Sequence, residues 1–305
     1  MIQKLNSRYT EQVKTLIEIL PFIAKNHNFA LKGGTAINLF VLNMPRLSVD
    51  IDLCYLPLSQ RDVALKDIDA FTTELSRQLT SIGFKCRTKN AVQGYESTIF
   101  VQSQRTEVKV EINLVVRGAV SSPIIKPLCP LSVDMFQRKV EMLCLNMNDL
   151  FAGKICAALD RQHPRDFFDI YMFLKEFSYT RELHQTFIAY LLSSKRPISE
   201  LIRPNYLDIK RTYQKQFSGM TSMNINVEDL EQTRNQIVEK TASFFSSEEK
   251  EFLLSFKQGE PKWDLFPLAV IQNLPSIQWK LHNIKMMDPK KRSDAVKKLE
   301  LKLSA

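Results

Sequence analysis

Glycine is scarce in this sequence, with 8 residues among 305. This scarcity excludes collagen-like and other glycine-rich architectures, and it makes the one adjacent pair, Gly33-Gly34, a feature to explain. No uninterrupted apolar run approaches the ~18 residues of a membrane span, and the first residues lack the apolar core of a secretion signal. We therefore expect a cytoplasmic protein with no membrane partner.

The motifs of several enzyme classes are also missing. The five cysteines form no CxxC pair and the four histidines form no HExxH, which argues against a zinc site. No Walker lysine follows a glycine loop, and there is no GxSxG elbow of a hydrolase. Because most cysteines lie in apolar runs, we expect them to be free and structural.

The chain is basic, with 42 Lys and Arg against 33 Asp and Glu, a net charge of +9. Residues 280–305 alone carry eight basic and three acidic residues, a net +5. A basic segment favours a polyanionic partner such as nucleic acid, although a solvated helix face has the same composition.

Hydrophobic periodicity predicts an α+β protein in which the strands precede the helices. The expected strands are residues 29–31, 49–56, 84–88, 95–102 and 107–116. The expected helices are residues 1–26 capped by Ser7, 35–42, a segment from Ser59 to Gly83, one from an Asn148 or Asp149 cap to 160, 165–177, 181–193, 228–245, 248–258 and 290–303. We therefore predict a core domain over 1–146 and a mostly helical domain over 147–305.

A strand, a glycine turn, a helix and a second strand follow one another between residues 29 and 56. At Gly33-Gly34 the turn into a helix leaves backbone N–H groups directed at one point, which suits phosphate oxygens. Asp50 and Asp52 lie two apart on a strand, so both carboxylates project from one face and favour a cation such as Mg²⁺ between them. A plain turn and a solvated strand edge are the alternatives. Lys32 and Thr35 can add a charge and a hydroxyl.

A third carboxylate is expected from the strand at 107–116, where Glu107, Lys109 and Glu111 share the polar face. If this strand pairs with residues 49–56, one glutamate lies beside the two aspartates, and the central position favours Glu111. Three carboxylates can hold two Mg²⁺ ions. An ordinary exposed strand residue is the alternative.

Charged residues interrupt the apolar helices between residues 154 and 169. Asp166 and Asp169 are three apart and share a helix face, and Asp169 is set among large apolar residues. A carboxylate buried there needs a partner, for which Lys154 or Arg165 is the obvious candidate. Two interpretations stay open: an ion pair between helices, and a nucleotide site in which Lys154 binds a triphosphate that Asp169 or Asp166 orients.

Taken together, these segments show a resemblance to a known family. GGTAINLF, RLSVDIDL, KVEINLVVRG and GKICAALDRQHPRDFFDIYMFL resemble the AbiEii family of nucleotidyltransferase toxins, a branch of the DNA polymerase beta-like superfamily. SFKQGEPKWDLF and LPSIQWKLHNI are similar to the C-terminal region of that family, so the resemblance spans nearly the whole chain. It implies a polymerase beta-like core with a mixed sheet and flanking helices, followed by a helical domain.

The resemblance also implies roles for single residues of the first domain. Gly33, Gly34 and Thr35 match the glycine motif that binds nucleotide, and Asp50 and Asp52 match the metal-binding pair. Ser48 borders this pair; in some family members the matching serine is a regulatory phosphorylation target, and an ordinary serine at a strand start is the alternative. Glu111 is the candidate for the third metal ligand.

For the second domain, the resemblance implies that Lys154 binds nucleotide phosphates. Asp169 matches the later motif aspartate, with Asp166 as the other candidate, and Arg165 and Asp166 are further candidates for nucleotide binding.

The predicted activity is metal-dependent transfer of NMP from an NTP to an acceptor hydroxyl, with Mg²⁺ or Mn²⁺ as cofactor. The resemblance implies the 3′ end of tRNA as acceptor, a block of translation, and a toxin of a toxin-antitoxin or phage-defence system with a cognate antitoxin as partner. Two alternatives stay open: nucleotidylation of a protein or small molecule, and a non-catalytic binding protein with this fold.

Overall fold

The computed structural model describes residues 5–89 and 96–304, which divide into two compact units. Unit 1 holds the described residues up to Leu150 together with Gln214–Ile225, and unit 2 holds Phe151–Tyr213 and the described residues from Asn226 onward. The predicted boundary at 146/147 misses the return segment Gln214–Ile225.

Backbone hydrogen bonds explain why the return segment belongs to unit 1. The Leu47 N–H donates to the Met220 carbonyl at 2.7 Å, and the Asn6 N–H donates to the Gly219 carbonyl at 3.0 Å. The Thr221 hydroxyl donates to the Pro45 carbonyl at 2.7 Å. These bonds join residues far apart in sequence, so no local pattern predicts them.

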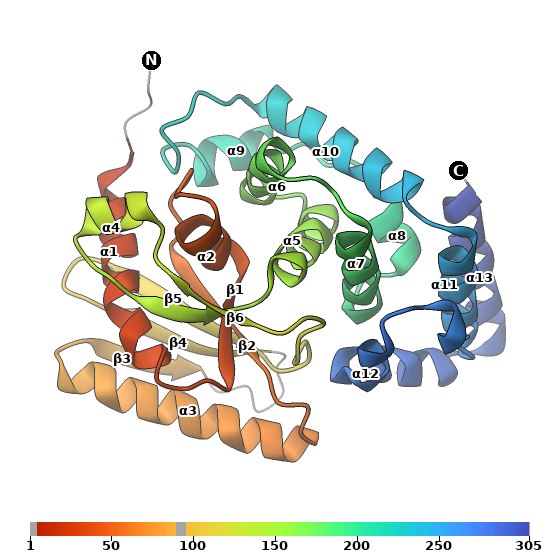
Figure 1. Ribbon diagram of the computed structural model, residues 1–305, viewed down its shortest axis with the longest axis horizontal. Coiled ribbons are helices and arrows are strands. Elements are labelled where there is room, and N and C mark those ends of the chain that lie inside the picture. Colours follow the sequence, from red (N-terminus) through yellow and green to blue (C-terminus); the bar gives the residue numbers. More distant parts are fainter. Residues whose placement is uncertain (1–4, 90–95, 305) are drawn as a thin grey trace. The chain divides into compact units, whose positions relative to one another are not determined.

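Unit 1 is built on one mixed sheet with the strand order β3-β4-β5-β2-β1-β7-β6 (Figure 1). β2 pairs in parallel with β5 and β1 in parallel with β7, and the other neighbours are antiparallel. The strands are β1 (Phe29–Lys32), β2 (Asp50–Tyr55), β3 (Lys85–Lys89), β4 (Glu96–Gln102), β5 (Glu107–Asn113), β6 (Ile124–Pro127) and β7 (Glu141–Cys144). The predicted α+β class and mixed sheet are confirmed.

Helices of unit 1 cover the sheet and form the turn after β1. α1 (Ser7–Ile23) and α3 (Arg61–Ser81) contact each other and the strands, and they bury one apolar stripe each. α2 (Gly33–Ala36) continues into the π-helical turn η1 (Ile37–Val41), and α4 (Pro130–Phe136) precedes β7. The alternation expected for β2 is present, because the buried Ile51 and Leu53 alternate with the half-buried Asp50 and Asp52.

Unit 2 is helical, as predicted. Its helices are α5 (Met147–Arg161, whose first turn lies in unit 1), α6 (Pro164–Glu176), α7 (Arg181–Ser193), α8 (Ile198–Ile202), α9 (Lys210–Gln216, which runs into the return segment), α10 (Val227–Ser243), α11 (Ser247–Gln258), the short turns η2 (Trp263–Leu265) and η3 (Ala269–Asn273), α12 (Pro275–Lys285) and α13 (Pro289–Ser304). No helix among the described residues has the length and apolar character to cross a bilayer.

Several predicted boundaries are wrong by a residue or two. Asn6, not Ser7, caps α1 by accepting the Arg8 N–H at 2.9 Å, and Gln60 rather than Ser59 precedes α3. Asp149 does not cap α5, because its buried carboxylate accepts two backbone N–H groups of residues 120 and 121 at 2.9 Å each. The predicted strand start at residue 95 and helix start before residue 5 lie outside the described residues. All five cysteines are free, as expected.

Candidate active site

The glycine turn brings the backbone against the aspartate strand. β1 ends at Lys32, and Gly33 takes a φ of +69°, a left-handed conformation that favours glycine. A Cβ on Gly33 would lie 2.3 Å from Oδ2 of Asp52, so only glycine leaves room for that carboxylate. The turn therefore places the N-terminus of α2 next to a metal-ligand candidate.

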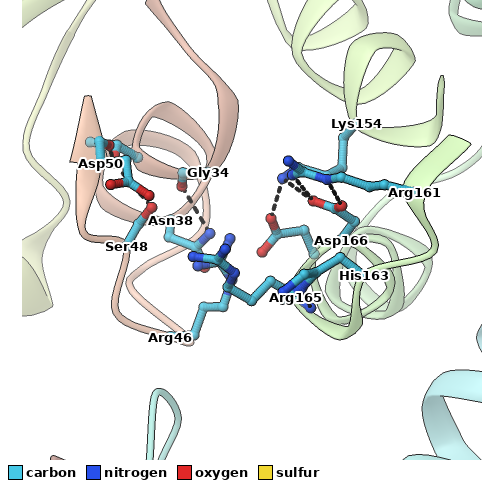
Figure 2. Close-up of polar contacts among 12 residues, drawn as sticks. Gly34, Asn38, Arg46, Ser48, Asp50, Lys154, Arg161, His163, Arg165 and Asp166 are labelled. Atoms are coloured by element: carbon cyan, nitrogen blue, oxygen red, sulfur yellow. Dashed lines mark hydrogen bonds and ion pairs between the residues drawn. The ribbon is translucent and has the colours of Figure 1, made fainter. Parts of the chain in front are cut away.

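Gly34 is enclosed by two polar side chains from the loop that precedes β2. A Cβ on Gly34 would lie 2.7 Å from Nη2 of Arg46 and 2.9 Å from Oγ of Ser48. Arg46 is 3% exposed, and its Nη1 donates to the Leu47 carbonyl at 2.9 Å. We call the turn at Gly33 and Gly34, with the adjoining Arg46 and Ser48, the corner; Figure 2 shows Gly34, Arg46 and Ser48 there. The corner thus holds a cation that the sequence analysis did not identify.

Buried hydrogen bonds fix the corner to β2. The Thr35 hydroxyl donates to Ser48 Oγ at 3.0 Å and also contacts the Asp50 carbonyl oxygen. Asn38 donates from Nδ2 to the Gly34 carbonyl at 2.9 Å (Figure 2). Thr35 and Ser48 are buried, so their hydroxyls position the glycines; their contact with nucleotide stays a prediction.

The sheet register places the predicted acids on neighbouring strands. In the parallel pair of β2 and β5, Asp52 lies opposite Glu111 and Asp50 opposite Lys109. The predicted pairing of these strands is therefore confirmed. The Lys109 ammonium contacts the Glu111 carboxylate at 2.9 Å, and Lys32 lies opposite Asp52 on β1. Two cations therefore flank the carboxylates along the strands.

The donor chemistry at Asp50 and Asp52 fits a divalent cation. Carboxylate oxygens are the ligands that Mg²⁺ prefers, and both residues are half-buried on one face of β2. Over residues 5–89 and 96–304, no three Asp, Glu, His or Cys side chains are arranged to hold a metal. Because Glu111 is paired with Lys109, its role as third ligand stays a prediction.

A buried ion network lies in unit 2. The Lys154 ammonium on α5 contacts Asp166 at 3.0 Å and Asp169 at 2.8 Å, both on α6 (Figure 2). Arg161 binds Asp166 with two hydrogen bonds of 2.6 and 2.9 Å. Burial raises the pKa of Asp166, but the Lys154 charge and the Arg161 contacts outweigh it and hold the pKa well below its usual value.

The network shows an ion pair between helices, one of the two interpretations of this cluster. Both aspartates bind Lys154, so contact with Lys154 does not distinguish Asp166 from Asp169. His163 caps α6 by accepting the Arg165 N–H at Nδ1, at 3.1 Å. The roles of Lys154, Arg165 and the aspartates toward nucleotide stay predictions.

A comparison with protein families decides the assignment. The model of the AbiEii family, described as nucleotidyl transferase toxins of type IV toxin-antitoxin systems, matches residues 15–283. The chain belongs to the AbiEii family. It is thus a nucleotidyltransferase toxin, an enzyme of a class that uses an NTP and a divalent metal, and its family implies a cognate antitoxin.

Other comparisons add a similar structure. MenT4, a nucleotidyltransferase toxin from Mycobacterium tuberculosis, is similar at a TM-score of 0.49 and 12% identity, over 97% of this chain and 92% of that one. No curated protein sequence matches the chain.

In this AbiEii protein, the sequence did not lead us to predict Arg46 as part of the corner. Arg46 sits in an apolar loop between two predicted elements, four residues before Asp50. A buried arginine needs partners, so a basic residue in such a loop is a signal for a nearby anion or carbonyl.

Proposed function

We propose that this AbiEii toxin transfers NMP from an NTP to a hydroxyl at the 3′ end of tRNA, in a Mg²⁺-dependent reaction that stops translation. The observation that carries the proposal is the contact of Gly33 with Asp52. It supports a site where the triphosphate and its metal lie side by side, because a carboxylate there adjoins the N-terminus of a helix.

In the proposed site, the triphosphate is bound by backbone N–H groups of α2 and by the positive charge of Arg46. The first N–H groups of α2 have no acceptor within the helix, so they are donors for phosphate oxygens. Arg46 adds a positive charge whose Nη2 is 2.7 Å from the Cβ position of Gly34. Thr35 and Asn38 hold these groups in place before the substrate arrives, which lowers the entropic cost of binding.

Asp50 and Asp52 are the residues that would hold the metal, with Glu111 as a third candidate. Bound Mg²⁺, or Mn²⁺ in its place, supplies charge neutralisation for the departing pyrophosphate and lowers the pKa of the attacking hydroxyl. The acceptor oxygen forms a bond to the α-phosphorus, the bond from that phosphorus to the bridging oxygen breaks, and pyrophosphate leaves. The hydroxyl proton passes to solvent.

The residues of unit 2 belong to the proposal as phosphate-binding groups. Lys154 is the candidate for binding the nucleotide phosphates. Arg165, Asp166 and Asp169 would position Lys154 or the nucleotide. Lys154→Arg keeps a charge in the ion network, so the proposal expects a folded protein with reduced transfer. Wild-type transfer by Lys154→Arg would remove Lys154 from the proposal.

Ser48 is the proposed point of control. Its Oγ is 2.9 Å from the Cβ position of Gly34, so a phosphoryl group on it adds negative charge where the nucleotide phosphates bind. We expect Ser48→Glu to lose transfer and Ser48→Ala to keep most of it. Equal activities for the two variants would refute this control.

Labelled nucleotides test the activity and the acceptor together. The protein is incubated with Mg²⁺ and each NTP, labelled on the α- or the γ-phosphate, together with tRNA or cell protein. The proposal predicts α-label on tRNA, no transfer of γ-label, and no transfer by Asp52→Asn. Label on protein or on small molecules instead would point to the alternative acceptors. A protein that labels none of them would contradict the proposed activity.

A further inference from the structure

An exposed tryptophan marks one face of α12. The Trp279 side chain is 54% exposed, and its ring stacks on His282 with 5.8 Å between centroids and 20° between planes. The other tryptophan, Trp263, instead packs against the rings of Phe252 and Phe256. More than half of the Trp279 side chain is therefore open to solvent, beside the ring of His282.

Further positions on α12 and its C-cap residue, Met286, are exposed as well. Met286 is 74% exposed, two turns after Trp279, and Asn283 and Lys285 are exposed between them. Residues three and four apart share a helix face, so Trp279, His282, Asn283 and Met286 form one stripe. We call this stripe the α12 face.

Positive charge lies at the C-terminal end of the α12 face, where α13 begins. Arg292 of α13 donates to the carbonyls of Ile284 and Lys285 at 3.5 and 3.4 Å, which holds the start of α13 at the end of α12. Lys285, Lys290 and Lys291 make no ion pair with any residue in 5–89 or 96–304. Figure 1 shows α12 and α13 together in the blue C-terminal part of the chain.

We infer that the α12 face binds single-stranded RNA, with one base stacked on the Trp279 and His282 rings and the adjoining phosphates bound by Lys285, Lys290 and Lys291. Any base offers a π-face to an aromatic ring, and lysines track the backbone, so such a surface needs no particular sequence. The inference rests on the proposed function, because it names a second contact for the acceptor RNA.

The charge of this region favours RNA over a protein partner. Lys280 is held by three backbone carbonyls, but residues 281–305 still carry seven basic and three acidic residues, a net +4. Each lysine that binds a phosphate releases counterions from the RNA, which strengthens binding at low salt. A protein that docked on Trp279 and Met286 would have to be acidic to complement Lys285, Lys290 and Lys291. Docking of such a protein is the competing outcome.

Fluorescence of a single tryptophan tests the stacking directly. Trp263→Phe leaves Trp279 as the only tryptophan, and Trp279→Phe is the matched control that reports on Trp263. Each variant is titrated with oligouridylate and, separately, with heparin, a polyanion without bases. We expect oligouridylate to quench Trp279 but not Trp263, and heparin to bind without quenching. RNA binding with unchanged Trp279 fluorescence, or no RNA binding, would overturn the inference.

A kinetic measurement separates this inference from the proposed function. In the labelling assay with tRNA, Trp279→Ala is expected to raise the KM for tRNA about tenfold, within the range for loss of one stacked base, with kcat and the KM for NTP unchanged. Trp279→Phe should keep the wild-type KM. An unchanged KM in Trp279→Ala would refute the inference alone. A wild-type protein that labels no RNA would refute the proposed function as well.

Discussion

Replacing Gly33 by alanine gives the sharpest perturbation of the corner. At a φ of +69°, an L-residue costs about 1–2 kcal/mol. The added Cβ would also lie 2.3 Å from Asp52 Oδ2, where an ordinary contact is 3.4 Å or more, so the carboxylate must move by about 1 Å. A displacement of that size costs on the order of 100-fold in rate at a reacting centre.

Gly83 provides a matched control in the same unit. It also has a positive φ, +100°, but a Cβ there meets nothing within 4 Å. We expect Gly83→Ala to lose about 1–2 kcal/mol of unfolding free energy and to keep its activity within about twofold. We expect Gly33→Ala to lose at least as much stability and about 100-fold in kcat.

Urea unfolding and the α-label assay measure both quantities on the same preparations. Asp52→Ala removes the side chain that the new Cβ meets, so Gly33→Ala/Asp52→Ala should recover stability relative to Gly33→Ala and remain inactive. Equal activities of Gly33→Ala and Gly83→Ala would show that the position of Asp52 does not matter for the reaction.

Three further predictions concern buried charges in unit 2. Lys154→Met leaves two carboxylates that are 0% exposed, Asp166 and Asp169, so it should cost about 3–5 kcal/mol in urea unfolding. Arg77→Met, which breaks the exposed pair of Arg77 with Glu74, is the control and should change the unfolding midpoint far less. Because folding lowers the pKa of Asp166, this carboxylate adds to the free energy of unfolding above pH ~4, and the contribution is lost as pH falls below that value. Asp166→Asn should therefore make the free energy of unfolding depend less on pH below ~4. Burial lowers the pKa of Lys280 to about 7, so the unfolded chain binds more protons above that pH, and the free energy of unfolding should rise from pH ~7 to ~10; Lys280→Met should abolish this rise. An unchanged pH profile in either variant would contradict the corresponding assignment.

The local pattern of polar and apolar residues was enough to predict the strand and the turn that form the corner. Alternation of aspartates with Ile51 and Leu53 defines β2, and the break in apolar pattern at Gly33 defines the turn into α2. The placement of Glu111 opposite Asp52 followed from matching polar faces of two strands. These features depend on residues near one another in sequence or on a period-two pattern.

Features that depend on distant contacts were missed. β6 and β7 have four residues each, too short for a pattern, and their pairing defines them. The return segment Gln214–Ile225 joins unit 1 through backbone bonds to residues 6 and 47. Arg46 belongs to the corner only because its loop folds over Gly34. The two acids on Lys154 were predicted as alternatives, since spacing alone does not show that one ammonium reaches both.

The most direct measurement is a crystal structure of the protein with a non-hydrolysable NTP and Mn²⁺, read by the anomalous signal of the metal. We predict a metal peak at the Asp50 and Asp52 carboxylates and triphosphate oxygens at the backbone N–H groups of Gly33 and Gly34. A nucleotide and metal bound elsewhere on the chain, with these residues vacant, would contradict the proposed site.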